Sequence, residues 1–260
     1  MHDATSRILL LGVDYPTLGE YALALQADER TACALSVGAD AATMARAFKG
    51  DAAVPNEDAV LAIDTGERTL LAVADAHYGH AASHVLLQEL DARGSTLPRN
   101  VLELFDLVCA IGGTESDATD VSESTLLVAV LDRGRGVTFG VSFGDSSVVV
   151  AGRAPAVPRN VRHPVYVTPR VAESLHPTRG VEFEFAVTPG ELVVAFTDGV
   201  DECCYRTPEA SLQPSDIMAV AVSAKMQPEA FVAGLTELAL VGVRGNPGGQ
   251  DNIAIAATRV

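Results

Sequence analysis

Acidic side chains recur at the ends of apolar segments in this sequence. Asp75 follows the run TLLAVA, Asp198 follows ELVVAFT, and Asp251 follows a Gly-Gly turn and precedes another strand-like segment. Glu57 and Asp58 stand directly before the run AVLAI. Because short continuous apolar runs are typical of buried strands, each carboxylate is expected at a rigid strand end. Strand ends from distant parts of a chain can meet at one edge of a sheet, so these acids are candidates for one shared site.

Carboxylates gathered in this way favour divalent cations. They repel one another unless they are protonated or neutralised. Mg²⁺ and Mn²⁺ prefer oxygen ligands and retain several waters, and two such ions about 3.5 to 4 Å apart can deprotonate a bridging water that attacks phosphorus. Taken singly, each acid has an ordinary alternative role as a turn or cap residue. The set predicts a two-metal hydrolytic centre, with isolated turn residues as the alternative.

The elements that must position these acids follow from the apolar pattern. Strands are expected at 30–37, 60–63, 69–74, 124–131, 137–143, 147–151, 181–187, 191–196 and 252–260. Helices are expected at 80–90, 99–111, 215–224 and 228–241, with a loop and helix at 38–49. Loops are expected at 112–122 and, as a long flap, at 153–180. Strands that cluster at both ends, with helix pairs between and after them, indicate two sheets flanked by helices rather than a parallel βαβ sheet.

Composition narrows the class of protein. The chain has 260 residues, 48% of them hydrophobic, and a formal net charge of −16. Such a charge repels nucleic acid and anionic membrane surfaces, so neither is an expected partner. The four cysteines form no CxxC pair, and no signal peptide or membrane span is recognised, so a cytoplasmic protein with reduced thiols is expected. The sequence also lacks GxSxG, P-loop and HExxH motifs, which leaves serine-nucleophile, nucleotide-binding and zinc-protease classes without support.

Five short motifs occur in a recognisable order. They are Asn56-Glu57-Asp58-Ala59, Val73-Ala74-Asp75-Ala76-His77-Tyr78-Gly79-His80-Ala81-Ala82, Phe143-Gly144-Asp145-Ser146-Ser147, Thr197-Asp198-Gly199-Val200 and Gly248-Gly249-Gln250-Asp251-Asn252-Ile253. This order resembles the metal-dependent protein phosphatases of bacterial type (the PPM, or type 2C, serine/threonine phosphatase family) from about residue 30 to residue 260. The resemblance implies an α+β fold, a four-layer αββα sandwich of two mainly antiparallel β-sheets flanked by helices. It implies one domain over 1–260, with 1–29 as an N-terminal extension or first strands and 153–180 as the flap.

The resemblance also implies roles for individual residues. Asp75 matches the aspartate that bridges two Mg²⁺ or Mn²⁺ ions, whose bridging hydroxide is the nucleophile. Ala76 stands at a glycine whose carbonyl reaches one ion. The remaining metal ligands would be Asp198 and Asp251 at the first ion and Glu57 and Asp58 beside the second.

Further family positions concern proton transfer and a third ion. His77 matches a proposed general acid for the leaving alkoxide, against the alternative of an exposed loop imidazole. His80 matches a histidine that is structural. Asp145 with Ser146 would organise a turn. Asp117 or Asp120 could hold a weak third ion, with a solvated acidic loop as the alternative.

Three positions depart from the family pattern. Ala53 replaces an arginine that binds the substrate phosphate, Ala76 replaces the glycine, and Glu123 replaces a glycine at the start of the next strand. If position 76 required a positive φ, its Cβ would cost about 1 kcal/mol. Arg46 and Lys49 could replace the missing arginine only if their loop folded back.

Two functions remain open on these grounds. The first is a Mg²⁺/Mn²⁺-dependent phosphatase acting on phosphoserine or phosphothreonine in a phosphorylated protein or peptide. The second is a catalytically impaired pseudophosphatase that binds a phosphoprotein or a serine/threonine kinase. Four arginines of the flap are expected either to meet acidic phosphopeptides or to be solvated: Arg159, Arg162, Arg170 and Arg179.

Overall fold

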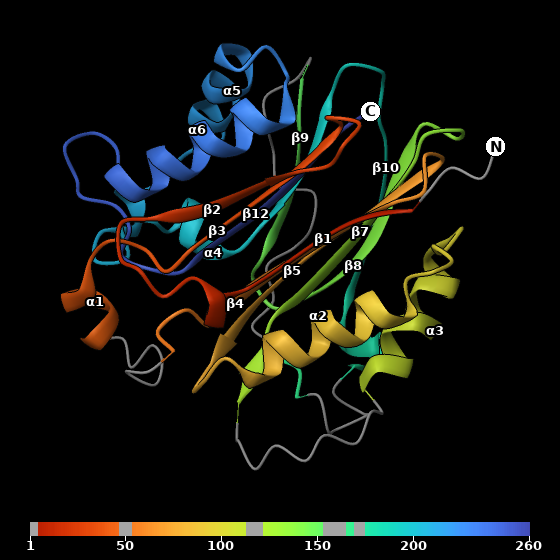
Figure 1. Cartoon of the computed structure of the whole chain (residues 1–260), viewed down its shortest axis with the longest axis horizontal. Helices are drawn as coiled ribbons and strands as arrows, with labels where there is room; N and C mark the ends of the chain where they lie inside the picture. The colour runs from red at the N-terminus through yellow and green to blue at the C-terminus, as the bar shows by residue number, and fades with distance from the viewer. Residues whose placement is uncertain (1–4, 47–53, 113–121, 153–164, 169–174) are drawn as a thin grey trace.

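Two antiparallel β-sheets, with helices on both outer faces, make up a four-layer sandwich (Figure 1). The computed structural model describes residues 5–46, 54–112, 122–152, 165–168 and 175–260. The α+β sandwich predicted from the sequence is confirmed. Among these residues no helix is long and apolar enough to cross a membrane.

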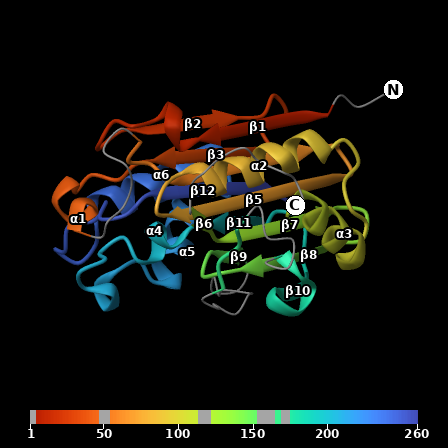
Figure 2. The same ribbon diagram turned by 90° about the horizontal axis from the view of Figure 1, so that it is seen from below.

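The first sheet has seven strands in the order β1-β4-β5-β7-β8-β10, with β6 paired to β5. Figure 2 shows this sheet from β1 at one edge to β10 at the other. The strands are β1 (Ser6–Leu11), β4 (Asp58–Asp64), β5 (Arg68–His77), β6 (Glu123–Ser124), β7 (Leu126–Asp132), β8 (Val137–Phe143) and β10 (Val181–Ala186).

The second sheet has five strands in the order β2-β3-β12-β11-β9. They are β2 (Tyr21–Leu25), β3 (Thr31–Ser36), β9 (Ser147–Ala151), β11 (Leu192–Phe196) and β12 (Ile253–Arg259). The first twenty-nine residues thus contain β1 and β2, one strand for each sheet. The expected strand at 124–131 is divided, because β6 ends at Ser124 and pairs with β5 before β7 begins.

Helices cover each sheet on its outer side. The outer face of the first sheet carries α2 (Ala81–Arg93) and α3 (Val101–Gly112), and that of the second carries α5 (Pro214–Ser223) and α6 (Pro228–Val241). Shorter elements are α1 (Ala41–Arg46), α4 (Asp198–Asp201) and the 3₁₀ turns at Gly12–Asp14, Pro177–Arg179 and Pro208–Ala210.

The period-two alternation of the strands divides the core into three layers. Along β4, Leu61 and Ile63 pack under α2 and α3, whereas Val60 and Ala62 face the second sheet. Because small aliphatic residues dominate both faces, the two sheets pack directly on each other, as contacts between β12 and both β4 and β5 show.

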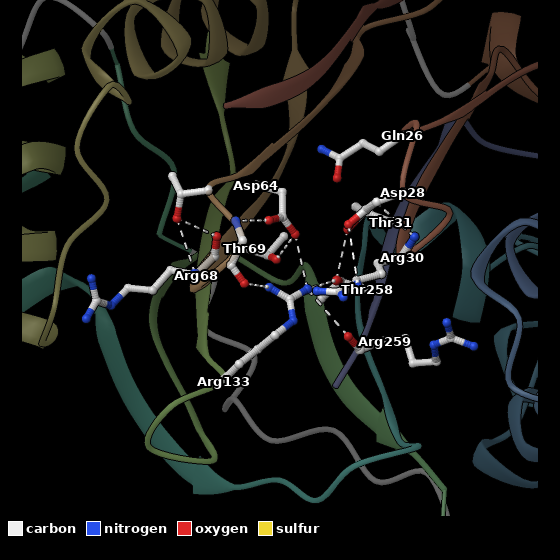
Figure 3. A network of polar contacts seen from close by, with 12 residues as sticks. Gln26, Asp28, Arg30, Thr31, Asp64, Arg68, Thr69, Arg133, Thr258 and Arg259 are labelled. Atoms are coloured by element: carbon white, nitrogen blue, oxygen red, sulfur yellow. Dashed lines mark hydrogen bonds and ion pairs between the residues drawn. The ribbon is translucent and has the colours of Figure 1, made fainter. Parts of the chain in front are cut away.

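A polar network joins the two sheets at the end where β4 finishes (Figure 3). Arg133, at the β7–β8 turn, contacts Asp64 of the first sheet at 3.1 Å and Thr258 of the second at 3.2 Å. Asp64 also accepts a hydrogen bond from Thr69. The opposite end, where β4 begins, is therefore the end at which Asp58 and the other candidate acids lie.

Candidate metal centre

Two candidate ligands of the first sheet are direct cross-strand partners. Asp58 opens β4 and pairs with Asp75 of β5. Paired residues of an antiparallel ladder project their side chains to the same face, with Cβ atoms about 5 Å apart. Asp58 is two residues from Val60 and Asp75 two residues from Val73, so both aspartates project to the same face as these valines, toward the second sheet. The two buried carboxylates therefore stand side by side between the sheets, at the end where β4 begins, where like charges would repel.

The second sheet brings its own acids to this end. Asp198 begins α4 directly after β11, and the preceding Thr197 donates its hydroxyl hydrogen to Asp58 Oδ2 at 2.7 Å. Asp251 lies two residues before β12. A Cβ on Gly199 would lie 1.7 Å from the carbonyl oxygen of Asn252, so only glycine lets these two segments approach so closely.

Glu57 is tied into the same end through its backbone. Its N–H donates to the Asn252 side chain at 2.8 Å, and its carbonyl accepts hydrogen bonds from the Ser83 hydroxyl and the Ala76 N–H. Its carboxylate accepts the Gly79 N–H. Glu57 therefore fixes the turn that follows β5 as well as standing beside Asp58.

The residues fit a hard dication in the chemistry of their donors. Asp58, Asp75 and Asp251 are about 1% exposed, Asp198 is half-buried, and all offer carboxylate oxygens, which Mg²⁺ and Mn²⁺ prefer. Within the described ranges, however, no three His, Cys, Asp or Glu side chains come close enough to hold one ion together. The acids are thus neighbours through strand pairing and shared hydrogen bonds.

Ala76 causes no strain at the glycine position. It lies in β5, pairs with Ser124 and is not among the residues with positive φ. Ala76 therefore does not carry the backbone strain that its Cβ would cause at a positive φ.

His77 lies at the end of β5, between two tyrosines. Its ring meets Tyr166 edge-on at a centroid distance of 4.7 Å and Tyr78 at 6.4 Å. Tyr78 has φ of 63° and is 72% exposed. Glu123, in the third departing position, pairs with His77 across β5 and β6 and so forms part of the rim.

Tyr166 is a site residue that the sequence analysis missed, because its segment has no periodic pattern. Burial, together with smaller contributions from the carboxylates around it, raises the pKa of Tyr166 to about 12. In decreasing order of effect these carboxylates are Asp145, Asp75, Asp198 and Glu123.

His84 was also missed, and it supports the site from behind. Its Nε2 accepts the Gly12 N–H at 3.0 Å, while the backbone of Asp58 hydrogen-bonds the same ring. The pKa of His84 is lowered to about 4, mainly by burial and to a smaller extent by the nearby His80, while the Asp58 hydrogen bond works in the opposite direction. His84 is therefore neutral and links the end of β1 to the start of β4. The sequence pattern that could have singled out His84 is its position one helical turn after His80.

The Asp145–Ser146 turn connects to Asp75 through one hydroxyl. Thr125 Oγ1 lies 2.9 Å from Ser146 Oγ and accepts the Asp75 N–H at 3.0 Å. The Asp145–Ser146 turn therefore supports the backbone of Asp75 through Thr125.

Several candidates from the sequence lie outside the described residues. These are Lys49, Ala53, Asp117, Asp120, Arg159, Arg162 and Arg170, together with the side chain of Arg46. Arg179 is described and is exposed, in the turn Pro177–Arg179.

Comparisons with known proteins show which solved structures share this fold. No protein-family model and no curated protein matched the sequence. Among solved structures, a bacterial serine phosphatase aligns with a TM-score of 0.63 at 16% identity, covering 82% of this chain and 94% of that one. The catalytic domain of the phosphatase PstP, in complex with two manganese ions, aligns at 0.59 and 17% identity, covering 98% and 99%. The S. agalactiae serine/threonine phosphatase aligns at 0.59 and 15%, covering 93% and 100%. The chain therefore has the fold of the bacterial PPM serine/threonine phosphatases, as its motifs implied.

Proposed function

We propose that this chain is a Mg²⁺/Mn²⁺-dependent phosphatase that hydrolyses phosphoserine or phosphothreonine in proteins or peptides. The observation that carries the proposal is the buried cross-strand pair Asp58–Asp75, set at the end of the sandwich where β11 and β12 bring Asp198 and Asp251. A hard cation makes such a like-charged pair tolerable.

Each residue has a role in this proposal. Asp75 and the Ala76 carbonyl would take part in holding the two ions. Asp198 and Asp251 would be further ligands of one ion, and Glu57 and Asp58 would lie beside the other. The bound ions would supply charge neutralisation for the phosphoryl group and an activated water.

His77 is the proposed general acid of this reaction. It is held at the rim by strand pairing with Glu123 and by the ring of Tyr166. A proton on its imidazole can pass to the leaving alkoxide, which makes departure of the serine or threonine oxygen easier.

The partners follow from the same charge argument. A phosphorylated protein is the substrate, and a serine/threonine kinase is a further candidate partner. The net charge of −16 disfavours nucleic acid and anionic membrane surfaces. All four cysteines are free, which suits a reducing cytoplasm.

Hydrolysis of p-nitrophenyl phosphate with Mn²⁺ tests the proposal. We expect turnover by the wild-type chain and its loss both in EDTA and in Asp198→Asn. Asp28→Asn is the matched control, because Asp28 is an exposed acid at the opposite end. Equal rates in all four samples would overturn the proposal.

A second candidate is a catalytically impaired module that binds phosphoproteins or a kinase. The observations in its favour are the departures from the family pattern at Ala53, Ala76 and Glu123, of which Glu123 pairs with the proposed general acid His77. Tight Mn²⁺ binding by calorimetry without turnover of any phosphopeptide would select this candidate, whereas turnover would exclude it.

A further inference from the structure

Val167, the next residue in the chain, fixes the position of Tyr166 relative to Asp75. Val167 is fully buried and forms an isolated antiparallel bridge with Ser124, in which Val167 N donates to Ser124 O at 2.7 Å and Ser124 N donates to Val167 O at 2.9 Å. The Ser124 hydroxyl in turn donates to the carbonyl oxygen of Asp75 at 3.0 Å. Two residues, Val167 and Ser124, thus connect the Tyr166 backbone to Asp75.

The ring of Tyr166 packs on the proposed general acid. Its edge-on contact with His77, at 4.7 Å between centroids, is an ordinary favourable aromatic geometry. Within the described part of the chain, the Nδ1 of His77 is buried and makes no hydrogen bond, so the tyrosine ring is a main contact that orients this imidazole.

The hydroxyl of Tyr166 lies in the field of acids from four separate segments. They are Asp145 after β8, Asp75 in β5, Asp198 in α4 and Glu123 in β6. Asp75 and Asp198 are themselves candidate ligands of the metal centre, and the Tyr166 side chain among these acids is half-buried.

We propose that the Tyr166 hydroxyl contacts the substrate phosphoryl group, donating a hydrogen bond to one of its non-bridging oxygens while the ring holds His77 in place. This inference rests on the proposed phosphatase function and adds a substrate-binding residue to it. A phenol keeps its proton at neutral pH and is a donor. A neutral donor among carboxylates binds an anionic oxygen without adding another charge, and a hydrogen bond to a charged acceptor is stronger than a neutral one.

The matched substitution is Tyr166→Phe, which removes the hydroxyl and keeps the ring against His77. We expect inorganic phosphate to bind the Mn²⁺-loaded protein at least about tenfold more weakly in calorimetry. We also expect KM for a phosphopeptide to rise with it, with the melting temperature unchanged. Tyr21→Phe is the control, since Tyr21 donates its hydroxyl to Glu237 on α6, which covers the outer face of the second sheet.

A second pair of variants separates donation from packing. Tyr166→Gln keeps a neutral donor without the ring, and Tyr166→Leu keeps neither. The inference predicts tighter phosphate binding by the glutamine variant than by the leucine variant. A purely structural tyrosine predicts equal weakening in both.

The outcomes distinguish this inference from the function on which it rests. An active wild-type protein whose Tyr166→Phe variant binds phosphate as tightly as wild type overturns the inference alone. A wild-type protein that neither binds Mn²⁺ nor hydrolyses phosphate esters overturns both. Weaker phosphate binding by Tyr166→Phe, with Tyr21→Phe unchanged, supports the inference.

Discussion

Thr197 donates its hydroxyl hydrogen to Asp58 across the space between the two sheets, with the oxygens 2.7 Å apart. The same hydroxyl oxygen accepts the N–H of Ala254 at 2.9 Å. A single side chain therefore ties the start of β4 to the end of β11 and to β12. Because Asp198 follows it directly, Thr197 also sets how the acids of the second sheet stand relative to Asp58 and Asp75.

Thr197→Val should weaken both the fold and the metal centre. The substitution keeps the shape but leaves the buried Ala254 N–H without this acceptor, so we expect the free energy of unfolding to fall by about 1 to 3 kcal/mol. Urea denaturation measures the change, and Mn²⁺ titration should show weaker binding. Thr197→Ser retains the hydroxyl and should lie close to wild type. Equal stability of the valine and serine variants would refute this role.

Gly199→Ala should disrupt the approach of the two ligand-bearing segments. The added Cβ meets backbone, 1.7 Å from the Asn252 oxygen, and backbone cannot rotate away as a side chain can. We expect a loss of about 2 kcal/mol or more in the free energy of unfolding, together with weaker Mn²⁺ binding. Gly134→Ala is the control, because its Cβ would meet only the Asp132 carboxylate, at 3.5 Å. If Gly199→Ala melts like this control, the close approach is not required.

His84 predicts a dependence of stability on pH. Its pKa is lowered from 6.5 to about 4 on folding, so between these values the unfolded chain binds more protons than the folded one. The contribution of neutral His84 to the free energy of unfolding is complete above pH 6.5 and is lost as the pH falls towards 4. The loss amounts to roughly 3 kcal/mol. His84→Gln cannot take up this proton and should lose less stability over the same range. Parallel pH profiles of the two proteins would contradict the assignment.

Arg133 should matter for stability alone. It joins Asp64 to Thr258 at the end of the sandwich opposite the acids (Figure 3), and its side chain is only 15% exposed. Arg133→Met leaves a buried aspartate without this partner, so we expect a loss of about 3 kcal/mol with unchanged Mn²⁺ affinity. Arg30→Met, which removes an exposed ion pair with Asp28, should cost under about 1 kcal/mol. A change of Mn²⁺ affinity in Arg133→Met would show that the two ends are coupled.

Sequence patterns predicted the positions that adjoin long apolar runs. Asp198 and Asp251 stand close to the ends of β11 and β12, as the patterns predicted. The predicted strand 69–74 was too short, because β5 continues through Asp75 to His77 and pairs there with β6. Antiparallel pairing then brings these positions together. The helices 228–241 and 215–224 followed from composition in the same way, the first to the residue.

What the patterns left open depends on contacts between distant residues. Residues 1–29 gave no firm assignment, because β2 is a short edge strand that is only partly buried. Tyr166 acquires its place from one bridge to Ser124, and Thr197 from a hydrogen bond to a residue 139 positions away. No local spacing encodes either contact.

Calorimetric titration of the metal-free protein with Mn²⁺ tests the central claim most directly, namely that these acids hold dications between the ends of the two sheets. The account predicts two bound ions in the wild-type protein and loss of binding at both sites in Asp75→Asn, with Asp28→Asn binding as wild type does. Absence of Mn²⁺ binding by the folded wild-type chain, or identical titrations of wild type and Asp75→Asn, would contradict it.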